Sequence, residues 1–330
     1  TMRKSMKKLI ALTLACLMLA TLFVGCGKKD DGGSSGGDTI KLGWMGSLTG
    51  DQAAYGTCES QTLKMLVEDL NANGGLLGKQ VELICYDTKG DAQEAVNVAK
   101  RLCAQDQVCA IIGPNASGQC IAIQSVLDQY KISDMSTVAT NEKVTMQDGQ
   151  LKEYNFRVCF LDPFQGTVHA NYAFKEMGAT KAYTLAMLGS DYDQGLVYYF
   201  SEAFKGLGGE VVSEDFPEGN ANFVSYINNA MADGADVIFC PVSTNYAQLI
   251  IEAAAAQGFK GAILGTDTVD NNMVLESTKG KDVRLLVTTF YQEGGSPEFD
   301  AGIKQWLNEN PDMMTNNGGN DVVAGVTAMG

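Results

Sequence analysis

The sequence has 330 residues but only one histidine, His169, and no two cysteines spaced as Cys-x-x-Cys. Zinc sites are built from clusters of these ligands, so no metal site is expected. His169 lies early in a predicted helix and outside any nucleophile–base motif, and we expect it at the surface.

From Asp38 onward the sequence also lacks three chemical signatures: the Gly-x-Ser-x-Gly turn of serine hydrolases, the Gly-x-x-x-x-Gly-Lys phosphate loop and the dinucleotide-binding fingerprint. Acidic residues are numerous, but no spacing singles out a catalytic pair of carboxylates. We therefore predict that the protein is not an enzyme and has no cofactor.

Positive charge is scarce in the body of the chain. From Asp38 to Gly330 there are 18 basic residues against 37 acidic ones, a net charge of −19. So acidic a surface repels phosphate backbones, and nucleic acid is not an expected partner. The charge also has a plainer role, because a solvated acidic surface keeps a protein soluble.

No apolar run reaches the roughly 20 residues that a helix needs to cross a bilayer. The run at residues 9–24 follows a basic stretch and leads into a Leu-Phe-Val-Gly-Cys box that ends at Cys26. This arrangement is typical of a bacterial lipoprotein signal, in which Cys26 receives diacylglycerol and becomes the first mature residue. The alternative is a plain secretory signal followed by an ordinary cysteine.

These features predict a signal peptide at residues 1–25 and a flexible Gly/Ser tether at residues 26–37. The predicted location is extracytoplasmic, with the protein anchored to the cell membrane by lipid on Cys26.

The cysteines do not form a recognisable disulfide framework. Seven remain after the leader, an odd number without close pairing. Four of them fall at apolar positions of predicted strands or helices, where cysteine behaves as a small hydrophobic residue. These four are Cys85, Cys103, Cys109 and Cys240.

Short β-branched runs alternate with amphipathic segments of helical length, which is typical of parallel α/β sheets. The body is longer than one hydrophobic core usually serves, so two lobes are expected. We predict lobe 1 at residues 38–158, lobe 2 at 159–289, and a return to lobe 1 at 290–330 that stops within an incomplete helix. The predicted strands are 40–47, 80–87, 108–112, 132–136, 182–188, 210–216, 237–240, 262–265 and 285–289; the predicted helices are 55–73, 91–105, 117–130, 163–177, 194–207, 223–233, 246–257 and 297–310.

Several short segments occur in a specific order: IKLG at 40–43, SLTGD at 47–51, DLNANGGLLGK at 69–79, IIGP at 111–114, ATN at 139–141, NFR at 155–157, QG at 165–166 and DY at 191–192. In this order the chain resembles the extracytoplasmic solute-binding proteins of branched-chain amino acid ABC transporters, the Leu/Ile/Val-binding type.

The resemblance implies a type I periplasmic-binding-protein fold: α/β, with two lobes, each a doubly wound parallel sheet, and the ligand in the cleft between them. It implies a monomeric receptor that binds an amino acid or similar small solute by lobe closure and delivers it to ABC permease subunits. A receptor that signals ligand to a membrane partner is the alternative.

A free amino acid needs donors for its carboxylate and acceptors for its ammonium. Residues 113–118 follow a predicted strand and open a helix, so backbone N–H groups and the Ser117 hydroxyl can hold a carboxylate. The resemblance assigns the carboxylate-binding serine to Ser117; the alternative is that Ser117 only caps its helix.

The resemblance assigns further contacts around the ammonium group. The Thr140 hydroxyl would reach the carboxylate or the ammonium, and the Val138 carbonyl and Asp267 would accept from the ammonium. For Asp267 the alternative is a turn or helix-cap role. Tyr55 and Tyr192 would flank the ligand from opposite lobes, or else pack in the core or at the rim; Trp44 is expected in the core.

The chain departs from the Leu/Ile/Val-binding pattern where a ligand side chain would lie. Asp321 stands where that family has an aromatic residue, and Val242 or Ser243 where it has a tyrosine. A carboxylate forms no favourable interaction with an apolar ligand side chain, and a carboxylate that is buried without a partner is costly. A polar or cationic amino acid is therefore expected rather than leucine.

Overall fold

The structure is a computed structural model that describes residues 39–50 and 52–290, together with residues 297, 301, 305 and 308. Every described residue belongs to one compact unit, which begins at Thr39. The predicted signal peptide, tether and lipidation site at Cys26, the predicted site residue Asp321 and most of the predicted helix 297–310 lie outside the described residues.

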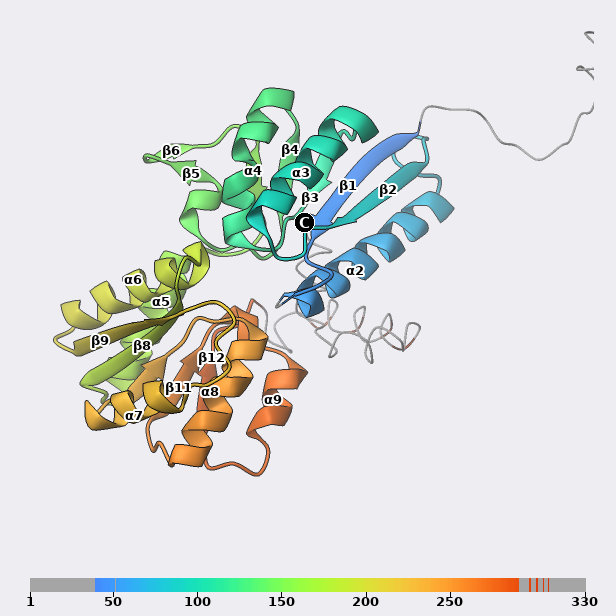
Figure 1. Ribbon diagram of the computed structural model, residues 1–330. Coiled ribbons are helices and arrows are strands. Elements are labelled where there is room, and N and C mark those ends of the chain that lie inside the picture. Colours follow the sequence, from blue (N-terminus) through green and yellow to red (C-terminus); the bar gives the residue numbers. More distant parts are fainter. Residues whose placement is uncertain are drawn as a thin grey trace, which may run out of the picture. The chain divides into compact units, whose positions relative to one another are not determined.

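The first half of the described chain forms a five-stranded sheet with strand order β2-β1-β3-β4-β7 (Figure 1). Every neighbouring pair in this sheet is parallel, and in β1 Trp44 lies opposite Cys85 of β2 and Ile112 of β3. The strands are β1 (Ile40–Gly46), β2 (Val81–Asp87), β3 (Ala110–Ile112), β4 (Ser133–Ser136) and β7 (Asn155–Arg157).

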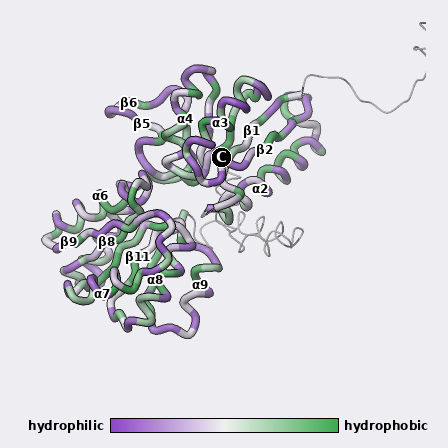
Figure 2. Tube along the Cα trace, viewed as in Figure 1, coloured by the Kyte–Doolittle hydropathy of each residue, from purple (hydrophilic) through white to green (hydrophobic). Residues whose placement is uncertain are grey.

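Helices connect these strands and cover both faces of the sheet. The α3 and α4 helices share one buried cluster with Met45 and Ile111, whereas α2 packs in another cluster through Tyr55 and Cys58. In Figure 2 hydrophobic and hydrophilic stretches alternate along α2, as expected of a helix with one buried face. The bounds are α2 (Ala53–Ala72), α3 (Ala92–Arg101, continued by a π-helical turn at Leu102–Asp106) and α4 (Ser117–Tyr130).

The second half forms another five-stranded sheet, with strand order β12-β11-β10-β8-β9 and parallel pairing throughout. Its strands are β8 (Lys181–Met187), β9 (Glu210–Phe216), β10 (Val237–Phe239), β11 (Ala262–Gly265) and β12 (Arg284–Val287). Its helices are α5 (Asp162–Asn171, continued by a π-helical turn at Tyr172–Glu176), α6 (Asp191–Gly206), α7 (Val224–Ala232), α8 (Thr244–Gln257) and α9 (Asn272–Thr278).

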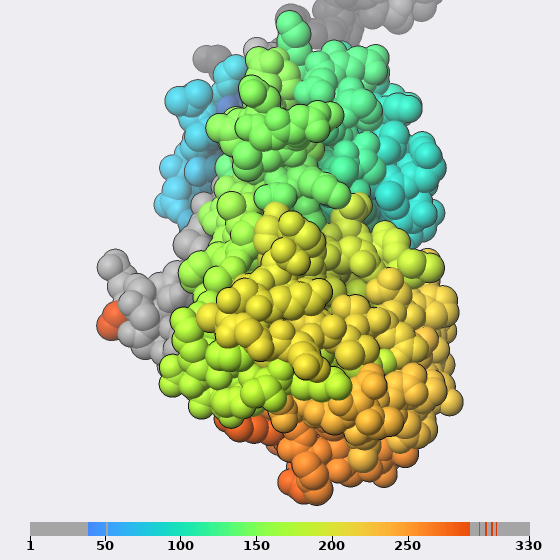
Figure 3. All heavy atoms as spheres, turned by 90° about the vertical axis from the view of Figure 1, so that its left-hand side faces the viewer, coloured from blue at the N-terminus to red at the C-terminus, as the bar shows by residue number. Residues whose placement is uncertain are grey.

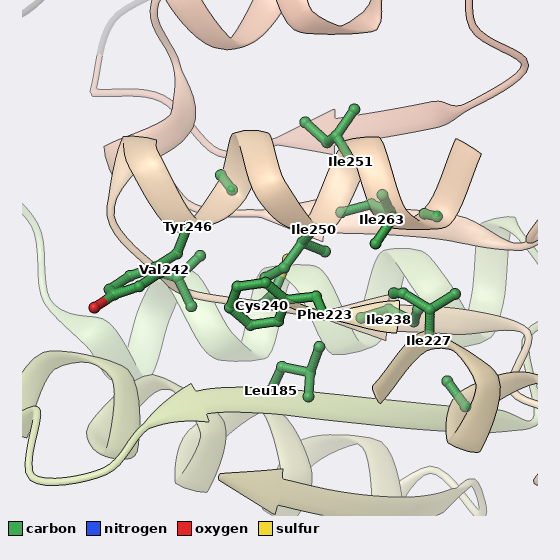
Figure 4. Close-up of a cluster of buried hydrophobic side chains, with 14 of the residues drawn as sticks. Leu185, Phe223, Ile227, Ile238, Cys240, Val242, Tyr246, Ile250, Ile251 and Ile263 are labelled. Atoms are coloured by element: carbon green, nitrogen blue, oxygen red, sulfur yellow. The ribbon is translucent and has the colours of Figure 1, made fainter. Parts of the chain in front are cut away.

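Strand periodicity explains why this second sheet is covered on both faces. Along β10 and the residue after it, Val237 and Phe239 join the cluster with α5 and α6, whereas Ile238 and Cys240 join the cluster with α7 and α8. Successive side chains of a strand point to opposite faces, so an apolar run buries both. Figure 4 shows the α7–α8 side, where Ile250 of α8 lies over the β10 side chains.

These two sheets confirm the predicted α/β fold with two doubly wound lobes. The strands of the first sheet all precede residue 158 and those of the second lie between 181 and 287, while the lobe boundaries themselves stay predictions. Among the strands and α-helices, four were not predicted: β7, the β5 (Met146–Gln147) and β6 (Gln150–Leu151) strands of a hairpin, and α9. Each is too short to give a periodic signal in the sequence.

Two expectations about side chains were wrong. His169 is buried rather than exposed: its ring lies against Phe239, its Nε2 is 3.2 Å from Thr288 Oγ1, and burial lowers its pKa to about 4. Cys109 is exposed, because it precedes β3 instead of lying within it. Cys103 and Cys240 are buried and Cys85 is half-buried, and Trp44 is in the core as expected.

Within the described residues no helix is both long and apolar enough to cross a membrane. The same residues hold no group of three or more side chains suited to bind a metal ion.

The close packing of α5 on α6 depends on a glycine. A Cβ added to Gly166 of α5 would lie 2.8 Å from the backbone nitrogen of Phe200 in α6, which is closer than packed atoms approach. This contact brings Phe200 onto the sheet, where its ring stacks on Phe239 with centroids 4.3 Å apart. Figure 3 views the molecule from the left-hand side of Figure 1, with α6 in yellow.

We predict that Phe200→Ala lowers the free energy of unfolding by about 3–5 kcal/mol, because it removes a fully buried ring and leaves a cavity. Tyr198→Ala in the same helix is the matched control, since Tyr198 is 59% exposed, and it should cost less than about 1 kcal/mol. Urea unfolding of both variants measures the difference. Equal midpoints would contradict the role given to Phe200.

Candidate functional site

A pocket lies where loops at the carboxyl ends of strands from both sheets meet. About 410 Å³ of empty space lies within it, part of it open to solvent. Open α/β sheets bind ligands at this edge, because the loops after the strands converge there. The lining residues are Gln52, Tyr55, Asn115, Ala116, Ser117, Val138, Tyr192, Ser243, Thr244, Asp267 and Thr268.

Five of the seven predicted ligand-binding residues line this pocket: Tyr55, Ser117, Val138, Tyr192 and Asp267. Thr140 does not, and Asp321 is outside the described residues. The roles of these residues toward a ligand stay predictions, but the structure brings the five together.

Ser117 begins α4 and is buried at the pocket. The N-cap of this helix is Ala116, which has no capping side chain, so the alternative role of Ser117 as the cap is not what the structure shows. Instead the Ser117 hydroxyl accepts a hydrogen bond from the backbone nitrogen of Asn141 at 3.2 Å, and no described residue accepts one from its own proton. The first N–H groups of a helix lack intrahelical acceptors and carry partial positive charge, which favours an anion.

The turn before α4 needs glycine at one position. Gly113 has φ of 88°, and a Cβ there would lie 2.2 Å from the carbonyl oxygen of Met45 in β1. A residue with a side chain would push the turn away from the strand, and with it Ser117.

Asp267 follows β11 and is buried among polar partners. Its Oδ1 accepts hydrogen bonds from the Tyr192 hydroxyl at 2.7 Å and from Gln165 Nε2 at 2.8 Å, and its backbone nitrogen donates to Gln165 Oε1 at 3.0 Å. Burial raises the pKa of this carboxyl to about 6, although the two donors partly offset the effect. The carboxylate does not cap α9, because Asn271 does so through Val274 N.

The two tyrosines approach Asp267 from different lobes. Tyr55 of α2 donates to the backbone carbonyl of Asp267 at 2.6 Å, and thus links the first half of the chain to the second. Tyr192 of α6 donates to the carboxylate, and its oxygen lies 2.8 Å from Thr266 Oγ1. A second link between the halves is the Asn141 side chain, which donates to the carbonyl of Asp191 at 2.7 Å.

Thr140 is buried but does not line the pocket, and its hydroxyl is close to the buried carboxyl of Asp162. Burial raises the pKa of Asp162 to about 8, while the neighbouring Thr140 hydroxyl lowers it and Asp267 raises it further. Asp162 is therefore mostly protonated at pH 7, so Asp267 is the carboxyl that can carry charge at the pocket. Arg157 of β7 holds this loop by donating to the carbonyls of Ala139 and Asn141.

Sequence reasoning missed five contributors, and named a sixth, Ser243, only as one of two alternatives for a position near the ligand side chain. Gln165 orients Asp267 although 102 residues separate them, and only its place in a family-like segment could have drawn attention to it. The other five line the pocket just after predicted strands, so the strand-end rule could have found them, but not which way their side chains point. These five are Gln52, Asn115, Ser243, Thr244 and Thr268.

Comparison with known proteins decides the family. Residues 39–329 match the periplasmic binding protein family. The chain belongs to this family. Relatives of this periplasmic binding protein include an amino acid binding protein of Pseudomonas aeruginosa, 27% identical over 253 residues, which are 76% of this chain and 67% of the relative. The Leu/Ile/Val-binding protein of Escherichia coli is 26% identical, with the same coverage of 76% and 67%.

Solved structures agree with the family and the fold. A leucine binding protein from Thermotoga maritima has a TM-score of 0.78 and 27% identity, covering 88% of this chain and 81% of that one. A branched-chain amino acid transporter substrate binding protein from Streptococcus pneumoniae, in complex with isoleucine, has the same TM-score and identity, covering 88% and 82%. The family assignment supports solute binding, and these relatives are named as binding proteins rather than enzymes.

We predict that Asp267→Asn stabilises the ligand-free protein increasingly as pH rises from about 4 to about 6. The folded-state pKa is raised from 3.8 to about 6, so ionising this buried group costs stability in that window, and asparagine cannot ionise. The gain should level off above pH 7 at roughly 1–3 kcal/mol. Urea unfolding of both proteins between pH 4 and 8 measures it; a difference that does not vary with pH would contradict the buried charge.

Proposed function

We propose that this protein is a monomeric extracytoplasmic receptor that binds an amino acid or similar small solute between its lobes and delivers it to an ABC importer. The observation that carries the proposal is the pairing of opposite polarities in one pocket. The N-terminus of α4, with the Ser117 hydroxyl, suits a carboxylate, and Asp267 suits an ammonium.

Charge complementarity of this kind is strong because the site is buried. An ammonium beside Asp267 would compensate the carboxylate for the water that burial has removed. It would therefore lower the raised pKa of Asp267. Tyr192 and Gln165 already fix the carboxylate, so little further ordering is required on binding.

Lobe closure follows from the same contacts. Ser117 and Val138 belong to the first half of the chain and Asp267 to the second, so one ligand that touches all three holds the halves together. A ligand favours the closed form only to the extent that it binds that form better than the open one. The hydrogen bonds that Tyr55 and Asn141 form between the two halves would stabilise the closed form together with the ligand.

We predict that one or a few of the twenty amino acids raise the thermal unfolding midpoint of the soluble body, starting at residue 38. A ligand at 100 times its dissociation constant adds about 2.7 kcal/mol, which a melting curve detects. Asp267→Asn should fold normally and lose most of this shift, because the ammonium has no charged partner. If the folded wild-type protein responds to no amino acid, the proposed substrate class is wrong.

We also propose that lipid on Cys26 anchors the receptor to the membrane, with residues 26–37 as the tether. Cys26→Ala is predicted to move the protein from the membrane fraction of a bacterial host to the soluble fraction. Cys16→Ala, within the apolar run of the same leader, is the matched control and should stay with the membranes. Unchanged fractionation of Cys26→Ala would refute the anchor.

A further inference from the structure

The pocket has two chemically different ends. Gln52, Tyr192, Ser243 and Thr268 also line a neighbouring cavity of about 690 Å³ of empty space, part of it open to solvent. Ser117, Val138 and Asp267 line only the first pocket. An amino acid held at Ser117 and Asp267 would thus extend its side chain toward the end formed by Gln52 and Ser243, which we call the distal end.

A chain of amide groups determines what Gln52 offers at the distal end. The backbone N–H of Ser47 can only donate, and it points at Asn115 Oδ1 at 3.1 Å. This fixes the orientation of the Asn115 amide, so its Nδ2 donates to Gln52 Oε1 at 3.2 Å. The Gln52 Nε2 is left as a donor, and it has no hydrogen bond to another residue in the described part of the chain.

Ser243 supplies a hydroxyl that is able to donate a second hydrogen bond. It occupies the N-cap position of α8, yet its side chain caps nothing. Its Oγ is buried and has no hydrogen-bond partner among the described residues. Buried hydroxyls are rarely left unpaired, because desolvation without a partner is costly.

The first turn of α8 adds to the donor character of the distal end. The first intrahelical bond runs from Ala247 N to Ser243 O, so the Thr244 N–H precedes the helical ladder and carries the partial positive charge of a helix N-terminus. The threonine hydroxyls nearby are already used: Thr244 donates to the Thr268 carbonyl, and Thr268 donates to the Val242 carbonyl.

We propose that the ligand is an amino acid whose side chain ends in a hydrogen-bond acceptor, an amide or a carboxylate, which Gln52 and Ser243 bind at the distal end. This inference rests on the proposed function. An apolar side chain would leave these donors unpaired. The Ser243 hydroxyl can donate or accept, but a lysine or arginine side chain would place positive charge and N–H donors against the Gln52 Nε2 donor and a helix N-terminus. The earlier expectation of a polar or cationic ligand is thereby narrowed to a polar one. Lys89, Asp193 and Glu218 line the neighbouring cavity, and the Asp193 carboxylate already accepts hydrogen bonds from Met187 N and Ser190 Oγ. Charge there therefore does not separate amide from carboxylate.

Titration calorimetry with L-glutamine, L-glutamate, L-leucine and L-lysine tests the proposal on the soluble body. The expected result is that glutamine or glutamate binds at least tenfold more tightly than leucine and lysine. Ser243→Ala should weaken that ligand about tenfold, the effect of losing one well-placed hydrogen bond in a buried site. Ser213→Ala, at an exposed position of β9, is the matched control and should bind like the wild type.

Asn115→Leu is the complementary variant, because it removes the group that orients Gln52 and adds apolar surface. It should shift preference toward leucine by at least tenfold, and it keeps the test decisive if Ser243→Ala fails to fold. Leucine or lysine binding as tightly as the acceptor-bearing ligands would overturn the distal-end inference and leave the proposed function intact. Absence of binding by every amino acid, in a folded protein, would instead overturn the proposed function.

Discussion

The site depends on one constraint: the carboxylate of Asp267 is buried, and a buried charge needs partners. Gln165 and Tyr192 provide two donors, which fix the position of Oδ1 and reduce the cost of ionisation. Burial still raises its pKa to about 6, so the group is charged at neutral pH but incompletely compensated. Binding of a cation that fits this site is favourable because it compensates the carboxylate charge. An amino-acid receptor requires such a site for the ammonium group of its ligand.

The fold explains how this carboxylate meets a donor of opposite polarity. Parallel strands place all their carboxyl ends at one edge, and each connecting helix begins at that edge. Helix N-termini of both lobes, α4 and α8, therefore face the same pocket as Asp267. The two N-termini differ in the pocket residues they carry: α4 begins at Ser117, whereas Ser243 precedes α8 and shares the neighbouring cavity with Gln52. The same architecture can thus hold the common part of an amino acid at one end and select its side chain at the other.

The errors of sequence reasoning share a cause. From local sequence His169 was expected at the surface and Cys109 at an apolar position of a strand. In the structure His169 lies against Phe239, 70 positions further along the chain, and Cys109 is exposed. Burial of a polar side chain is decided by the element that packs against it, and nothing in the neighbouring sequence identifies that element.

Local sequence was sufficient for the fold class and for most of the strands and helices. The α4 helix and strands β9 and β11 match their predicted bounds, because periodicity of apolar residues is a local property. The order of short segments was also enough to indicate the family and five residues that line the pocket. Tertiary structure alone decided which side chains hold one another: Tyr55 reaches Asp267 across 212 residues, and Gln165 across 102. Hydrogen bonds form between atoms that folding brings within about 3 Å, and sequence separation carries no information about that distance.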